Sequence, residues 1–528
     1  MANRDLRLIE SVKEYIKVMV PKFLEETKIR EDRVLQHPLD NDIVEKLEVF
    51  EIREDDDDYR IFYYVQEIKE IWKIIIEKSI KCLRFFDGRE PFLDNTSKNP
   101  IAYGVNELSE YFNQYTQFET MLYGGGKYYR DHVVHVFRVW LLGLDCLLDN
   151  KGEYLKRINI QEGVEVNSFE KICIWSMIAL THDLGYPLEK AQEIIEKTKT
   201  MMKSFVSNPT VLLDLSFDGI QNNMNDFVVR FMSSKMHQVE GKCPLDEKFD
   251  PMEKPFVARL QPKYYFKFQK SLERYNHGIL SAIIIYKLLI YFLESDFNIN
   301  EDYRFDKEEA RQFYIRREIL RAIAAHTCHD VYHLDMLNFG FLLIMADDAQ
   351  EWGRKRISEL YVKQISNYEF DSITPFFDVK KSTYKGDSEE KQINIHKFIV
   401  KEQFKFPKGE DNNLKGILAN LMRQSEGYQE IFRDGQDTAK RNFIFEKICD
   451  VVYEESKAVK FSVQFLISNE EKPTFKICVS SSNKNAINET YGEDFLQKIY
   501  KGYCVKQMNN HEDKIEYEIM DKVEGIGN

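Results

Sequence analysis

The sequence predicts a mainly α-helical protein with three regions: a helical N-terminal region (1–120), an all-helical domain (121–360) and a C-terminal α+β domain (361–528). Apolar residues recur at helical spacing through the first two regions, and strand-like alternation replaces this pattern after residue 361. A chain of 528 residues is also too long for one ordinary core, so several domains are expected.

The N-terminal region has the periodicity of amphipathic helices. In IFYYVQEIKEIWKIIIEKSIKCLRFF, residues 61–86, the side chains of Ile68, Trp72 and Ile75 share one face. The acidic run 55–58 lacks the alternating spacing of a calcium loop, so we expect a solvated loop there. The first residues are charged and helical in period, which predicts neither secretion nor organelle import.

The second region contains long segments that are apolar on nearly every side, a pattern typical of helices buried in a large core. These segments are 128–148, 169–185, 277–293, 316–330 and 338–361. The intervening stretch 198–270 is more polar and contains five prolines, so we expect an insertion or lid over the core.

The third region alternates apolar and polar residues as β-strands do. The alternation predicts strands at 393–406, 459–468, 474–480 and 514–521. Two segments between them, about 414–432 and 439–457, are expected to be helices. This mixture predicts an α+β domain.

The composition limits the partners and the location of the protein. Lys and Arg total 74 against 88 Asp and Glu, a net charge of -14, which does not favour a nucleic-acid polymer as partner. A small anionic substrate needs only a local cationic pocket or a bound metal. The eight cysteines form no CxxC pair, and the apolar run 279–293 is too short for a bilayer span. We expect a protein of the cytoplasm without a membrane segment, and the sequence leaves oligomerisation open.

Histidines are concentrated in the second region, where eight of the eleven fall between residues 132 and 333. The sharpest element is the doublet His182-Asp183 at the end of the apolar helix IWSMIALTHDLGYP. Adjacent helical residues point about 100° apart, so both reach one ion only near a helix end. Imidazole and carboxylate together suit divalent first-row metals. The eight histidines are His132, His135, His182, His237, His277, His326, His329 and His333.

One histidine on an apolar helix is more often a core residue than a ligand, so only the ordered set of His and Asp residues points to a metal. We interpret His237, His329 and His333 as structural or pocket-lining residues. Asp330 and Asp335 are expected to cap or solvate a turn, and Trp352 to pack under the site.

The ordered set H…HD…H…H…D resembles the HD superfamily of metal-dependent phosphohydrolases, over about residues 121–360. YYRDHVVHVFRVWLLGL looks like the first helix of that family, with His135 at the ligand position. His132, one turn earlier, is the alternative ligand or an outer-shell or phosphate contact. The last Asp of the family matches Asp347 in LLIMADDAQEWGR, with Asp348 as the alternative.

NHGILSAIII and LRAIAAHTCHD look like the segments that carry two further histidines in the binuclear branch of this family, at His277 and His326. The resemblance implies one or two divalent ions of the Mn, Mg, Fe, Co or Ni type. One ion would be held by His135, His182, Asp183 and Asp347, and the other by Asp183, His277 and His326.

The resemblance implies a hydrolase in which His182 and Asp183 are catalytic and metal-activated water attacks the phosphate ester of a nucleotide or cyclic nucleotide. Many family members have a Lys three residues after the doublet, where this chain has Tyr186. The missing charge is expected from Arg130, Lys190 or Arg354. In HDLGYP the GYP is fused to the doublet, unlike the cyclic-di-GMP phosphodiesterase branch, so that substrate is not inferred.

Two other functional classes fit the sequence. The domain is alternatively a catalytically silent nucleotide-binding sensor that controls the C-terminal domain, which the absent Lys favours. A third reading is an interaction scaffold in which the histidines are structural.

Overall fold

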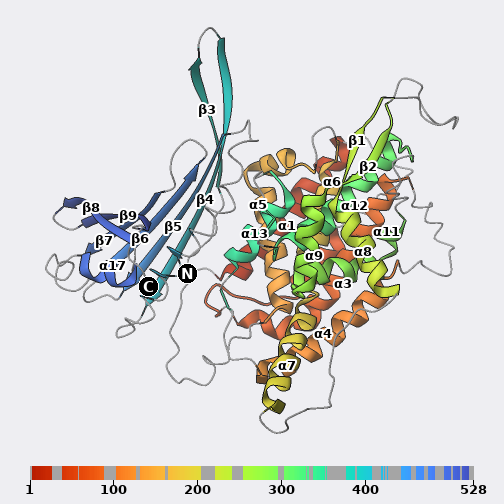
Figure 1. Cartoon of the computed structure of the whole chain (residues 1–528), viewed down its shortest axis with the longest axis horizontal. Coiled ribbons are helices and arrows are strands. Elements are labelled where there is room, and N and C mark those ends of the chain that lie inside the picture. The colour runs from red at the N-terminus through yellow and green to blue at the C-terminus, as the bar shows by residue number, and fades with distance from the viewer. Residues whose placement is uncertain are drawn as a thin grey trace. The chain divides into compact units, whose positions relative to one another are not determined.

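The computed structural model divides into two compact units, unit 1 (residues 1–331 and 337–358) and unit 2 (332–336 and 359–528). Among the described residues the protein is mainly helical, as predicted, with the large sheet confined to the C-terminal part (Figure 1). The described residues are 3–26, 39–57, 59–88, 103–125, 131–160, 164–203, 220–240, 254–294, 303–328, 330–331, 337–350, 352–353, 376–386, 389–406, 415, 418–419, 421–422, 425, 442–453, 459–468, 474–481, 493–500, 503–511 and 514–522.

Helices build unit 1, together with one short antiparallel ribbon. Its N-terminal helices are α1 (Arg4–Glu26), α2 (Asn41–Glu48), the 3-10 turn η1 (Arg60–Tyr64), α3 (Val65–Phe86) and α4 (Val105–Gly125). These are followed by α5 (Val133–Arg157), α6 (Ser168–Thr181), α7 (Tyr186–Lys203), α8 (Ile220–Ser233), the strands β1 (Ser234–Gln238) and β2 (Phe256–Leu260), α9 (Pro262–Glu273), α10 (His277–Leu288), α11 (Ile290–Leu293), α12 (Lys307–Ala325) and α13 (Phe339–Ala349).

Helix α6 lies at the centre of unit 1, where it packs against α3, α5, α12 and α13. Every residue from Phe169 to Thr181 is buried, as expected for a helix that is apolar on nearly every side. Asn167 and Glu170 form a capping box at its start, in which each side chain accepts the backbone N–H of the other residue. The cap fixes where the helix begins, and its far end carries the His-Asp doublet.

The stretch 198–270 is more regular than the expected insertion or lid. Where described, it contains the end of α7, α8, β1, β2 and most of α9. Val228 and Phe231 of α8 and Phe268 of α9 are fully buried, so these elements contribute to the core. Pro262 supplies the first turn of α9, where its missing N–H costs no hydrogen bond.

Unit 2 contains a seven-stranded sheet in the order β3-β4-β5-β6-β7-β9-β8, in which only the β4–β5 pair is parallel. The strands are β3 (Phe376–Gly386), β4 (Glu389–Phe406), β5 (Asn442–Tyr453), β6 (Val459–Ser468), β7 (Thr474–Ser481), β8 (Tyr503–His511) and β9 (Lys514–Lys522). The four predicted strands correspond to β4, β6, β7 and β9. Helix α17 (Glu493–Ile499) buries Leu496, and Tyr500 just beyond it packs edge-on against Phe475.

The predicted helix at 439–457 is wrong, because residues 442–453 form strand β5. The apolar residues of NFIFEKICDVVY fit both the helical period and the strand period, but its Phe, Ile and Val residues favour a β-strand. Pairing with β4 on one side and β6 on the other decides the matter. In the other segment, 414–432, the described positions 415, 418–419, 421–422 and 425 are helical as predicted.

No helix in the described ranges combines the length and the apolar composition that a bilayer crossing requires.

Candidate metal centre

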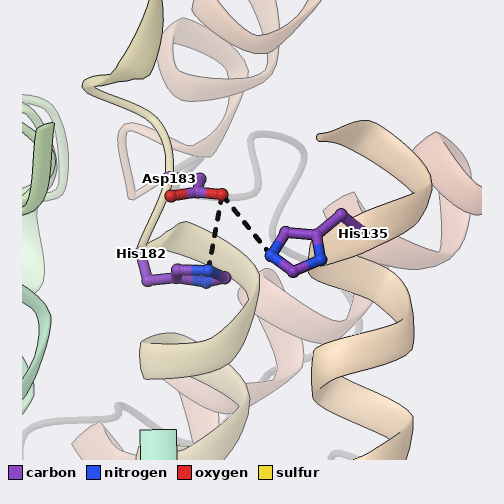
Figure 2. A group of neighbouring side chains, drawn as sticks. All are labelled: His135, His182 and Asp183. Atoms are coloured by element: carbon purple, nitrogen blue, oxygen red, sulfur yellow. Dashed lines mark ion pairs between the residues drawn. The ribbon is translucent and has the colours of Figure 1, made fainter. Parts of the chain in front are cut away.

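His182 occupies the C-cap position of α6, and its Nε2 atom faces the carboxylates of Asp183 and Asp347. Its Nδ1 lies 2.8 Å from the carbonyl oxygen of Ala179, which can only accept, so Nδ1 carries the proton. Nε2 is therefore the nitrogen left to bind a metal ion, and it lies 3.5 Å from Asp183 Oδ2 and 3.8 Å from Asp347 Oδ1. Figure 2 shows this ring beside Asp183.

His326 repeats the same arrangement at the end of α12. It is the C-cap residue of that helix, and its Nδ1 donates to the carbonyl of Ile323 at 2.6 Å. Its Nε2 lies 3.8 Å from Asp183 Oδ1. Each histidine thus satisfies one of the orphan carbonyls at its helix end while facing the same carboxylate.

His135 projects from the first turn of α5 toward the same two carboxylates, and Figure 2 shows it beside Asp183. Its Nε2 is 2.8 Å from Asp347 Oδ1 and 3.7 Å from Asp183 Oδ2. On the other side of the ring, Nδ1 donates to Gln350 Oε1 at 2.5 Å. The Gln350 amide nitrogen donates to the Trp352 carbonyl at 2.8 Å, which keeps its oxygen turned to His135.

His277 begins α10 and approaches Asp183 from the opposite side. Its Nε2 lies 3.3 Å from Asp183 Oδ1. Both its Nδ1 and its backbone N–H donate to Glu189 Oε2, each at 2.8 Å. All four rings therefore direct Nδ1–H outward to an acceptor and Nε2 inward, the arrangement that outer partners impose on metal-binding histidines.

Asp183 lies between two sets of donors and uses a different oxygen for each. Oδ2 faces His135 and His182, whereas Oδ1 faces His277 and His326. Three groups have candidate ligand atoms within 4.8 Å of one another. They are His135, His182 and Asp183; His182, His326 and Asp347; and Asp183, His277 and His326.

The charges of this cluster fit a cation. Burial alone would lower the pKa of His182, but the charges of Asp183 and Asp347 outweigh it and raise that pKa to about 9. Burial would raise the pKa of Asp183, yet the surrounding histidines hold it well below its usual value. Both carboxylates are thus ionised, and their charge favours a positive charge beside them, either a proton on His182 or a metal ion that takes its place.

Two buried atoms show most directly that a cation fits. Nε2 of His182 and Nε2 of His326 are buried and have no hydrogen-bond partner within the described ranges. A buried polar atom without a hydrogen-bond partner costs free energy. A divalent ion would satisfy both atoms, and imidazole with carboxylate is a donor set that such ions accept.

Three helix C-termini meet at the cluster. The α6 end carries His182, the α12 end carries His326, and Asp347 lies in the last turn of α13. The partial negative charge of each C-terminus stabilises a nearby cation. The three helix ends therefore favour a cation at this place, as the side chains of the cluster also do.

The N-terminal helices hold the doublet in place. Trp72 of α3 donates its indole N–H to the Leu180 carbonyl at 2.7 Å, and Tyr111 of α4 donates to the Leu184 carbonyl at 2.7 Å. These carbonyls flank the doublet at the end of α6, where the helix supplies no N–H partner. Gly185 then lets α10 approach, because a Cβ there would collide with the backbone of His277.

The remaining candidate residues lie in several places. His132, N-terminal to His135, contacts the Tyr186 ring with the centroids 3.9 Å apart and the planes tilted by 31°, and Glu119 lies 3.4 Å from its Nδ1. Lys190 lies over the Tyr186 ring and pairs with Glu189 at 3.4 Å.

Asp348 is exposed, whereas its neighbour Asp347 faces the cluster. His237 is on β1, Trp352 is buried, and Asp330 pairs with Lys270. Arg130, Arg354, His329, His333 and Asp335 lie outside the described residues.

Sequence reasoning missed the outer partners Glu189, Gln350 and Glu119. Glu189 follows the doublet by six residues in HDLGYPLEK, and Gln350 follows Asp347 by three. Both positions are one or two helical turns from a predicted ligand, which is a weak signal. Glu119 lies on a different helix from His132, and no local pattern indicates their contact.

Comparison of the chain with protein-family models, with curated proteins and with solved structures returns no match.

Proposed function

We propose that unit 1 is a metal-dependent phosphohydrolase that cleaves a phosphate ester of a nucleotide or cyclic nucleotide. The observation that carries this proposal is the convergence of four inward-facing imidazole nitrogens on Asp183 and Asp347 in a largely buried cluster. Core histidines are usually satisfied by neighbouring polar groups, and the buried Nε2 atoms of His182 and His326 are not, within the described part of the chain.

Two sets of residues would hold divalent ions. His135, His182, Asp347 and Oδ2 of Asp183 form one set, and His277, His326 and Oδ1 of Asp183 form the other. When bound, such ions polarise a phosphoryl oxygen and lower the pKa of water so that it attacks phosphorus at neutral pH. The set of nitrogen and oxygen donors suits Mn, Fe, Co or Ni, and the carboxylates also suit Mg.

The substrate would enter on the side of Asp347 and His277, because these are the more accessible members of the cluster. Their side chains are 28% and 19% exposed, against 0% for His182 and 1% for His135. His132, which contacts Glu119 and Tyr186, is our candidate for the residue that would exchange a proton with a leaving group. Lys190 is the described candidate for the charge that the family places at Tyr186.

The experiment that tests this proposal uses full-length protein purified without a histidine tag. We expect bound metal by elemental analysis and, with added Mn or Mg, turnover of bis-p-nitrophenyl phosphate and of members of a panel of mono-, di- and cyclic nucleotides. His182→Ala and Asp183→Ala should abolish both metal retention and turnover. His237→Ala is the matched control, since that histidine lies on β1 and outside the three groups of candidate ligands. Turnover by the doublet variants at the wild-type rate would show the proposal to be wrong.

A silent nucleotide sensor is the second candidate, and Tyr186 favours it. This aromatic ring, packed between His132 and His277, occupies the place at which the family carries a cation. A sensor would retain metal and bind one of the nucleotides in equilibrium dialysis without releasing phosphate or opening a phosphodiester. Metal retention with nucleotide binding and no turnover therefore separates the sensor from the enzyme.

A further inference from the structure

Helix α9 and the β-ribbon before it carry a concentration of positive charge that the proposed chemistry does not use. Residues 254–276 contain six basic side chains and one acidic side chain, in a chain whose totals are 74 basic and 88 acidic. We define the basic track as Lys235, Arg259, Lys263, Lys267, Lys270 and Arg274. Such a local reversal of the chain's charge balance indicates an anionic ligand.

The α9 part of the track is one stripe. At 100° per residue, Lys263, Lys267, Lys270 and Arg274 lie within about 60° of one another around the helix, and they extend over about 16 Å along it. Lys263, Lys270 and Arg274 are exposed, and Lys267 is half-buried. The stripe therefore faces solvent as a row of cations.

The track places like charges together, which is unfavourable unless an anion lies between them. On the ribbon, Lys235 and Arg259 are directly opposite each other in the antiparallel register, a pairing that destabilises a sheet. On α9, burial and then the charge of Lys263 lower the pKa of Lys267. In the described part of the chain, no carboxylate lies within ion-pair distance of Lys235, Arg259, Lys263 or Arg274. Two carboxylates accompany the stripe. Glu273 is exposed on α9 beside Arg274, and Asp330 pairs with Lys270 at 3.1 Å and has its pKa lowered by Lys270, Lys267 and Arg274.

The track begins at the rim of the metal centre. Arg274 precedes the candidate ligand His277 by three residues, and Asn276 between them donates to the Thr327 carbonyl, next to the candidate ligand His326. Farther along α9, Lys267 donates to the carbonyl of Asp330, in the segment that follows His326. An anion bound at the Arg274 end of the track would therefore lie close to the candidate ligands His277 and His326.

Aromatic side chains accompany the cations. Phe266 on α9 is 68% exposed, an unusual position for a large apolar ring. Tyr264 is covered by the guanidinium of Arg321, 3.9 Å from its ring centroid. A row of cations that neutralises successive phosphates, together with an exposed ring on which a base stacks, combines the two kinds of contact that bind single-stranded nucleic acid.

We propose that the basic track binds the phosphates of a short single-stranded oligonucleotide, one end of which lies in the metal centre. As a statement about the substrate, this inference rests on the proposed function. The length of the strand is limited because the rest of the chain is acidic and repels a long polyanion, which accounts for a track in a protein of net charge -14.

The test is a binding measurement that does not need catalysis. Fluorescein-labelled oligodeoxythymidylate and oligouridylate of about eight nucleotides are titrated with full-length protein in excess chelator, and anisotropy is followed over roughly 50 to 200 mM salt. The variant is Arg259→Gln/Lys263→Gln/Arg274→Gln. We expect affinity at least about tenfold lower and a log–log salt slope smaller by about 2, since each phosphate contact on a single strand contributes about 0.7.

Two controls make the result specific. Lys17→Gln/Lys46→Gln/Arg53→Gln removes the same charge from the N-terminal part of unit 1 and should leave affinity and slope unchanged. Phe266→Ala should weaken binding about tenfold, and Phe266→Tyr should restore it, because stacking needs only the ring. Circular dichroism of each variant shows whether it is folded.

Other outcomes overturn the inference. Equal affinity of wild type and the track variant for the strand, binding no tighter than that of thymidine monophosphate, or preference for an acidic peptide of the same charge would each do so. The proposed function fails separately. If bis-p-nitrophenyl phosphate is hydrolysed but the track variant binds the strand normally, only the track is wrong; if nothing is hydrolysed but the track variant loses binding, only the hydrolase is wrong.

Discussion

His182 and His326 occupy the same position in two different helices. Each follows the last residue of its helix, donates Nδ1–H to the carbonyl three residues earlier, and faces Asp183 with its Nε2. Both helices, α6 and α12, also begin with a capping box. The two helix ends therefore present two oriented Nε2 atoms to one carboxylate, and rotation of either ring would lose a hydrogen bond worth about 1 kcal/mol.

Divalent metal should stabilise unit 1. Added Mn, at about one hundred times its dissociation constant, should raise the free energy of unfolding of chelator-treated protein by about 2.7 kcal/mol, because the ion binds only the folded cluster. The rise in melting temperature is measured by differential scanning fluorimetry. His182→Ala and His326→Ala should lose the rise and His237→Ala should keep it. An equal rise in all three variants would mean that the ion binds elsewhere.

Gly185→Ala should separate the doublet from α10. The added Cβ would collide with the His277 carbonyl and lie 2.8 Å from the Ser281 backbone nitrogen, and backbone atoms cannot rotate away. We expect a loss of roughly 1–3 kcal/mol in unfolding free energy and reduced metal content, because His277 moves.

Gly88→Ala is the control for the effect of a glycine substitution by itself. Gly88 has a φ of 68°, and a Cβ there meets no atom within 4 Å. Only backbone strain of about 1–2 kcal/mol is expected, with metal content unchanged. If both glycine variants retained metal equally, contact between Gly185 and α10 would not be what positions His277.

Glu189→Gln should weaken metal binding without loss of fold. The Glu189 carboxylate accepts from both Nδ1 and the backbone N–H of His277, and these bonds hold the pKa of Glu189 at about 2 against the opposing effect of burial. The amide still accepts a hydrogen bond but lacks the charge that increases the basicity of the ring. Affinity for the ion on His277 and His326 should fall about 10–100-fold, measured by metal titration calorimetry.

Glu45→Gln, on the exposed face of α2, is the matched control for this charge change. Its titration should superimpose on that of the wild type. An unchanged titration for Glu189→Gln as well would show that Glu189 is only a structural partner of the α10 backbone.

Arg311→Ala should lower the stability of unit 1 by weakening the contact between helices α6 and α12. Arg311 forms ion pairs with Glu170 on α6 and with Asp87, whose side chains are 1% and 0% exposed. Removing one partner of a buried pair costs about 3–5 kcal/mol, measured by urea unfolding. Lys17→Ala, which breaks an exposed pair with Glu48, should cost about 1 kcal/mol or less.

The loss of unfolding free energy in Arg311→Ala should depend on pH in a defined direction. Burial raises the pKa of Glu170, and Arg311 opposes that rise, so without Arg311 the pKa rises further. A carboxyl group whose folded pKa lies above its unfolded value destabilises the fold above the folded pKa, and the penalty disappears as pH falls through it. The difference between variant and wild type should shrink on acidification. A difference that stayed constant or grew would contradict this role for Glu170.

Prediction from the sequence fails most clearly where one segment fits both the helical and the strand pattern of apolar residues. NFIFEKICDVVY suits a helix or a strand, and only pairing with β4 and β6 makes residues 442–453 a strand. For the stretch 198–270, prolines and polar residues predict an insertion or lid. The burial of Phe231 and Phe268 depends on contacts with helices distant in sequence, which the local pattern does not show.

The sequence by itself determined the buried helices and the set of residues that meet at the centre. Apolar residues on nearly every side of 169–181 and 277–288 can be accommodated only in a core, and polar His and Asp residues at the ends of such helices need partners there. Tertiary structure decided which partners they have. Gln350 meets His135 across 215 positions, Glu189 meets His277 across 88, and Lys235 faces Arg259 through strand pairing. Such contacts depend on how helices and strands pack, and local periodicity carries no information about that.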